Sequence, residues 1–154
     1  MQDYHFFQWL MSATLGLTIL SPIAASALGI VQYTPSNTFT LNVTIGNSQE
    51  DFGTVHIQSD SPNGWILQVR STQGGALRHS IYSYTIPYSL TVDGELISNL
   101  SSGNDITVRT TSTLTCDAPV GCTFPVQATL IASEVNGKPA GPYLDTLVFT
   151  LINQ

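Results

Sequence analysis

Apolar side chains recur at every second position in several separate runs of this chain, the spacing of β-strands that bury one face. From Thr85 to Val92, for example, Ile86, Tyr88, Leu90 and Val92 alternate with Thr, Pro or Ser. Series of this kind lie at 39–45, 54–58, 65–70, 85–92, 106–108, 124–130 and 147–151. No long run after residue 27 has the helical period. The pattern predicts an all-β antiparallel sandwich of roughly seven or eight strands.

Turn-forming residues separate these runs at 61–64, 74–75, 93–94, 102–104 and 136–137. Asp93-Gly94 is the best hairpin candidate, because a two-residue type I′ turn needs positive φ at both central positions. Pro87 cannot donate a ladder hydrogen bond, so it predicts an edge or a bulge in its strand. In the last run, Val148 and Ile152 add apolar side chains to the second face, which predicts a strand covered on both sides.

The first 27 residues have the features of a cleavable secretory signal. The stretch Trp9–Leu20 is uncharged and apolar but shorter than the ~20 residues that span a bilayer. Ala25 and Ala27 are the small residues of an A-x-A site, so we expect cleavage between Ala27 and Leu28. No Lys or Arg precedes Trp9, whereas a secretory signal normally starts with positive charge. The alternative is a buried N-terminal helix of the domain. Cleavage would leave one domain, 28–154, without a transmembrane anchor, secreted or displayed at the cell surface by way of the periplasm.

Charge is scarce in this chain, and its sign is negative. Charged residues make up 9 % of the sequence, against ~25 % in typical domains, and the net charge is −6. The basic residues are too scattered to follow a phosphate backbone, so nucleic acid is not an expected partner. They are Arg70, Arg78, Arg109 and Lys138.

The two cysteines, Cys116 and Cys122, lie close together in an exported chain, which favours a disulfide between them. The alternative, a metal site, would need further ligands, and no other His or Cys lies near them in the sequence.

The sequence contains no recognisable catalytic set, and we expect neither enzymatic activity nor a cofactor. A G-x-S-x-G nucleophile elbow is absent, and the spacing of His56 and His79 predicts solvated surface side chains rather than ligands or bases. The carboxylates adjoin turns in no calcium-binding spacing. Tyr82 and Tyr84 are interpreted as covering a sheet edge, with a sugar-binding platform as the alternative.

Two stretches resemble the spore coat protein U domain of archaic chaperone–usher pilins. One is 64–94, with Gly-Trp-Ile-Leu-Gln-Val-Arg-Ser, Gly-Gly-Ala-Leu and Ile-Pro-Tyr-Ser-Leu-Thr-Val-Asp-Gly. The other is 139–151, which is similar to the closing pattern of that family in Gly141, Tyr143, Asp145 and Thr146, followed by an alternating last strand. Asp51-Phe52-Gly53 is similar to its early Phe-Gly.

The resemblance implies an incomplete immunoglobulin-like sandwich that lacks or exchanges one strand. The N-terminal segment of one subunit would fill the missing strand of the next, building a surface filament for adhesion or biofilm. The candidate donor is the segment 28–35, through Leu28, Ile30, Val31 and Tyr33. The implied partners are copies of the chain or related subunits, a periplasmic chaperone and an outer-membrane usher.

A second interpretation is a self-complete secreted β-sandwich that binds glycan or cell wall. It is motivated by the grouped tyrosines and by Trp65-Ile66-Leu67, a tripeptide that resembles the WxL domains attached to cell walls.

Overall fold

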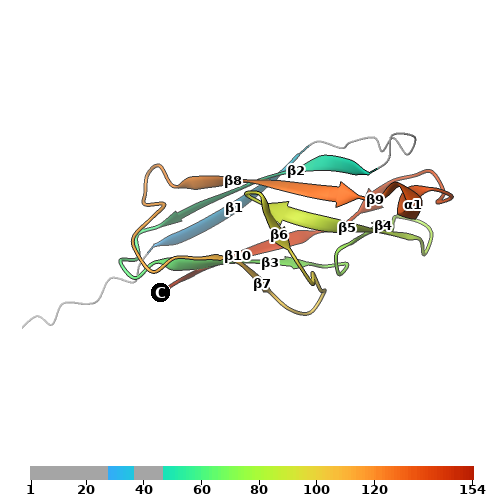
Figure 1. Cartoon of the computed structure of the whole chain (residues 1–154). Coiled ribbons are helices and arrows are strands. Elements are labelled where there is room, and N and C mark those ends of the chain that lie inside the picture. The colour runs from blue at the N-terminus through green and yellow to red at the C-terminus, as the bar shows by residue number, and fades with distance from the viewer. Residues whose placement is uncertain (1–27, 37–46) are drawn as a thin grey trace, which may run out of the picture.

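A computed structural model describes residues 28–36 and 47–154 of the chain. The predicted signal segment, including Ala27, and the run at 39–45 therefore lie outside the described residues. The domain is an antiparallel sandwich of two sheets, elongated along the strand direction (Figure 1).

The elements follow one another with short connections. They are β1 (Gly29–Pro35), β2 (Ser48–Ser59), β3 (Trp65–Ser71), β4 (Ala76–His79), β5 (Thr85–Val92), β6 (Glu95–Ile97), β7 (Ile106–Thr110), β8 (Cys122–Leu130), α1 (Ala132–Val135), β9 (Tyr143–Leu144) and β10 (Leu147–Asn153). The α-helix of the described residues, α1, has four residues. None of the described residues form a helix long and apolar enough to cross a membrane.

The larger sheet has the order β1-β2-β8-β5-β4-β9, with β6 paired to β5, and the smaller sheet has the order β10-β3-β7. All the pairs are antiparallel. The order β1-β2-β8-β5 corresponds to strands A, B, E and D of an immunoglobulin sandwich, and β3 and β10 correspond to C and F. The predicted all-β, immunoglobulin-like sandwich is therefore confirmed, and in the described residues no strand takes the place of strand G beside β10.

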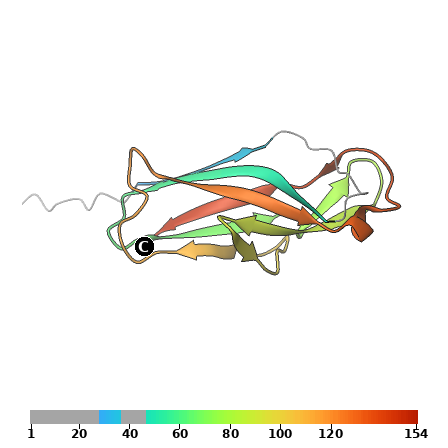
Figure 2. The same ribbon diagram turned by 45° about the horizontal axis from the view of Figure 1, so that its top comes forward.

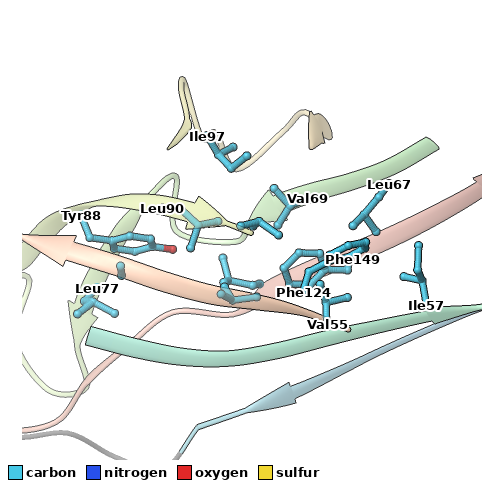
Figure 3. Close-up of a cluster of buried hydrophobic side chains, with 14 of the residues drawn as sticks. Val55, Ile57, Leu67, Val69, Leu77, Tyr88, Leu90, Ile97, Phe124 and Phe149 are labelled. Carbon is cyan, nitrogen blue, oxygen red and sulfur yellow. The ribbon is translucent and has the colours of Figure 1, made fainter. Parts of the chain in front are cut away.

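The core lies where the period-two pattern placed it, between the two sheets (Figure 3). Alternate side chains of β2, β3, β5 and β8 are buried, and Trp65 lies against Phe124 with ring centroids 6.3 Å apart. The buried apolar residues include Val55, Ile57, Leu67, Val69, Ile86, Leu90, Val92, Val126, Ala128 and Leu130.

The local predictions for turns and strand ends have different outcomes. Asp93 and Gly94 have φ of 52° and 79° and connect β5 to β6, as the type I′ prediction requires. Pro87 lies one residue before the ladder between β5 and β8 begins at Tyr88, so its missing N–H interrupts no pairing there. The second face of β10 is less covered than expected, because Val148 is only half-buried and Ile152 is exposed.

The predicted disulfide between Cys116 and Cys122 is present, with an S–S distance of 2.02 Å. Its loop is tied to the core, because the Cys116 carbonyl accepts a hydrogen bond from Ser59 N–H and the Thr115 carbonyl accepts one from the Trp65 indole. The disulfide therefore closes the loop that connects β7 to β8, and this loop is held against the end of β2.

We predict that the double variant Cys116→Ser/Cys122→Ser unfolds with about 2 kcal/mol less stability, since so short a loop restricts the unfolded chain only modestly. Urea denaturation with and without reductant measures this difference. The reductant should shift the midpoint of the natural chain and leave that of the double variant unchanged. Equal midpoints for all four samples would contradict the prediction.

Candidate functional site

The segment resembling the closing pattern of a pilin lies between β9 and β10, and its aspartate has an unusual number of partners. Asp145 accepts hydrogen bonds from the Ser71 and Tyr88 hydroxyls, both at 2.6 Å, and from the Thr72 hydroxyl at 3.2 Å. It also accepts the backbone N–H of Gln73 at 3.1 Å and of Thr146 at 2.6 Å. One carboxylate therefore connects the end of β3, the turn after it, the middle of β5 and the start of β10.

Tyr88 is a buried partner in this group, as is Ser71. Burial raises the pKa of its phenol far above the ordinary value, and the hydrogen bond to Asp145 and the charge of that carboxylate add to the effect. The hydroxyl therefore stays protonated and donates to Asp145. The sequence pattern placed Tyr88 on the apolar face of its strand but gave no signal that its hydroxyl would meet a carboxylate.

Gly141 and Tyr143 of the same motif enclose a histidine. A Cβ on Gly141 would overlap the His79 ring, and the Tyr143 ring meets that ring edge-on at 4.9 Å. The His79 Nδ1 accepts the N–H groups of Ile81 and Tyr82, which leaves Nε2 to carry the proton toward the Ala140 carbonyl at 3.4 Å. The His79 ring therefore holds together the residues at the end of the sandwich where β4 pairs with β9.

The prediction of a solvated His79 is wrong, since its exposed fraction is 3 %. Several residues that bury it, Gly141 and Tyr143 among them, lie some sixty positions away in the sequence, like Ala140 at a separation of 61. His56 is half-buried beside the Thr123 hydroxyl.

Thr146, the last residue of the motif, lies directly before β10. Its carbonyl accepts the N–H of Thr72, which continues the ladder between β10 and β3, and its N–H is held by Asp145. The four motif residues therefore lie along one continuous junction, and they fix where β10 starts and how it pairs with β3.

The second edge of β10 is unpaired in the part of the chain that the structure describes. Thr146 and Gln154, which flank β10, form hydrogen bonds with Thr72 and Gly64. With the register of the ladder, this means that the even-numbered residues of β10 direct their backbone groups toward β3. Antiparallel pairing alternates these directions. The N–H and C=O groups of Leu147, Phe149 and Leu151 therefore face away from β3, toward the side of the sandwich on which β1 lies.

The candidate donor segment forms β1, which pairs with β2 of its own chain along its full length. Figures 1 and 2 both show β1 beside β2 at the edge of the larger sheet. Val31 and Tyr33 are half-buried against the core, whereas Leu28 and Ile30 are exposed. In this structure the segment thus forms a strand of the larger sheet in its own chain, beside β2.

Two contacts place β1 alongside β10. The Tyr33 ring lies 5.2 Å from the Phe149 ring, and Gly29 approaches the side chain of Asn153. The two strands run in opposite directions and come within 8 Å at their Cα atoms, yet no ladder joins them. A further strand paired to both would need about 9.6 Å, two ladder spacings. Such a strand would therefore have to displace β1 or replace it.

A second surface feature lies at the end of the sandwich formed by β4, β5 and β9. The rings of Tyr82 and Tyr84 meet edge-on at 6.4 Å and are about half exposed, at 53 % and 47 %. Tyr82 rests on the His79 ring at 4.9 Å, and the Lys138 ammonium lies 5.9 Å from the centre of the Tyr84 ring. The tyrosines expected to cover a sheet edge therefore leave much of their rings in solvent.

Among the described residues, no group of three or more His, Cys, Asp or Glu side chains could hold a metal ion. Comparison of the chain with protein-family models and with curated proteins gives no match. The residues of this chain alone therefore carry the functional argument.

We predict that Tyr88→Phe lowers the free energy of unfolding at neutral pH by about 1–2 kcal/mol, because Asp145 loses a donor. The natural chain should lose stability as the pH rises above about 10, since Tyr88 stays protonated when folded and ionises when unfolded. This alkaline loss should be smaller in Tyr88→Phe. Thermal melts across an alkaline pH series measure both effects.

Tyr84→Phe is the matched control, since the Tyr84 hydroxyl makes no hydrogen bond with the described residues. Its stability at neutral pH should match that of the natural chain. If Tyr88→Phe also matches, the Asp145 network does not stabilise the fold as described.

Proposed function

We propose that this chain is a secreted, non-catalytic structural subunit that assembles with copies of itself or with related subunits by exchanging its first strand. The observation that carries the proposal is the position of β1: among residues 28–36 and 47–154 it is an edge strand, and it lies beside an edge of β10 that no described strand pairs. Every backbone contact of β1 could be made equally well by the same segment of a neighbouring chain.

The contacts of β1 are of the kind that strand exchange can reproduce. Its ladder to β2 supplies affinity that does not depend on sequence, while Val31 and Tyr33 supply the side-chain specificity. Tyr33 adds a ring contact with Phe149 and a hydrogen bond from its hydroxyl to the Phe52 carbonyl. Exchange of an identical element between protomers costs little, because the same contacts form in both states.

The edge of β10 that no described strand pairs supports a need for partners before assembly. Unpaired N–H and C=O groups along a strand edge are a template for uncontrolled pairing. In the proposed pathway a periplasmic chaperone covers this edge and an outer-membrane usher releases the subunit into a filament at the cell surface. The filament would serve adhesion or biofilm formation.

The trans arrangement can be tested with a chain that begins at Ser36 and a synthetic peptide of residues 28–35. We predict that the peptide binds the shortened chain and raises its melting temperature, because it restores the ladder to β2 and the Tyr33–Phe149 contact. A peptide with Val31→Asp and Tyr33→Asp should not bind. A peptide with Gln32→Asp, altered on the exposed face, should bind like the natural one.

Assembly itself is measured by comparing the chain from Leu28 with the shortened chain by sedimentation. Oligomers that form only when residues 28–35 are present support exchange. If both chains are equally stable monomers, and the peptide changes neither, the proposal of strand exchange is wrong.

A second candidate function is glycan binding by the tyrosine pair at the β4–β9 end. Tyr82 and Tyr84 present exposed rings on a base held by the buried His79, so little side-chain entropy would be lost on stacking against a sugar. We predict that Tyr82→Ala/Tyr84→Ala abolishes retention on a polysaccharide that retains the natural chain. Leu96→Ala, at an exposed apolar residue of β6, is the control. No retention on any glycan by the natural chain would end this candidate.

A further inference from the structure

The chain contains two Asn-Gly dipeptides, Asn63-Gly64 and Asn136-Gly137. Both asparagines are exposed, but the fold places the two glycines in opposite environments. An asparagine followed by glycine is chemically labile, because the glycine nitrogen can attack the side-chain amide with no side chain in the way. The attack needs a glycine peptide group that can rotate toward the asparagine side chain. The backbone around each dipeptide therefore decides which one reacts.

Asn136-Gly137 is the open case. Both residues are exposed, directly after α1, and they form the centre of a type II turn with φ and ψ of −61° and 134° at Asn136 and φ of 76° at Gly137. A single hydrogen bond closes the turn, from Lys138 N–H to the Val135 carbonyl at 3.2 Å. The backbone groups of Gly137 bond no described residue, and a Cβ placed on it would meet nothing within 4 Å.

Asn63-Gly64 is the closed case. Gly64 is buried, its N–H donates to the Ser61 carbonyl at 3.2 Å, and its carbonyl accepts the N–H of Gln154 at 2.9 Å. A Cβ on Gly64 would overlap the Thr111 backbone, so the peptide group is enclosed on that side. Rotation of this group requires opening of the β3 and β10 ends together.

We propose that Asn136 is a site of spontaneous deamidation in the folded protein and that the fold protects Asn63. The Gly137 backbone nitrogen attacks Cγ of Asn136, a C–N bond forms, and the side-chain nitrogen leaves as ammonia with the proton from the Gly137 N–H. Water then adds to one of the two carbonyls of the resulting succinimide. Opening at one carbonyl gives aspartate at position 136, and opening at the other gives isoaspartate.

Either product changes the surface at the β4–β9 end of the sandwich. A new carboxylate would lie two residues before Lys138, which makes no ion pair with the described residues and approaches the Tyr84 ring. Isoaspartate also lengthens the backbone just before Pro139, whose carbonyl accepts the Tyr143 hydroxyl at 2.9 Å. Deamidation would therefore increase the negative charge of the chain and loosen the approach to the β9 strand.

The test is to incubate the folded natural chain in mildly alkaline buffer and to follow both dipeptides by peptide mapping with isoaspartate detection. We expect conversion at Asn136 to be at least about tenfold faster than at Asn63, because Asn63 reacts only through local opening. In denaturant the two sites should convert at similar rates. Equal rates in the folded chain, or no conversion at Asn136 when the unfolded chain has reacted fully, would overturn the proposal.

Two variants separate the chemistry from general ageing of the sample. Asn136→Gln should abolish the fast phase and leave the slow conversion at Asn63 unchanged. Gly137→Ala should slow the reaction at Asn136, because its methyl group hinders the attacking nitrogen. If the fast phase persists in Asn136→Gln, it arises at another residue and the assignment is wrong.

Discussion

The carboxylate of Asp145 determines how the last strand joins the rest of the sandwich. It gathers donors from β3, from the turn after β3, from β5 and from the start of β10. Because β3 and β5 belong to different sheets, this one side chain holds the two layers together at the point where β10 begins. The position at which β10 begins determines how it pairs with β3 and which of its backbone groups point away from β3. The order of the core side chains on β10 then follows from its register.

Much of this fold could be predicted from alternation alone, since burial of one face is a local property of a strand. The runs that contain Trp65, Leu90 and Phe124 became β3, β5 and β8 with the expected faces buried. The short strands β4 and β9 could not be predicted in this way, because a few residues carry no period. They exist through pairing with each other and, for β4, with β5.

The candidate site was harder to predict because its contacts join residues far apart in the chain. The environment of His79 is made in part by Gly141 and Tyr143, which lie far away in the sequence, so the local pattern around His79 gave no signal of burial. The role of Asp145 could not be predicted either, because its partners Ser71 and Tyr88 lie 74 and 57 residues away in the sequence. The pattern of residues 28–35 also does not distinguish a strand that pairs within its own chain from one that pairs with a neighbour, since both use the same alternation.

The start of β1 and the end of β10 lie at the same end of the sandwich, where Leu28 accepts a hydrogen bond from Asp60 and Gly29 approaches Asn153 (Figure 1). The two strands run in opposite directions, so a short turn could lead directly from one into the other. In a circularly permuted chain joined at this point, β1 would follow β10 as the final strand of the sequence. The contact between Tyr33 and Phe149 would then join two strands that are consecutive in the sequence. The strand that pairs with β2 at the edge of the sheet would be the last strand of the chain instead of the first.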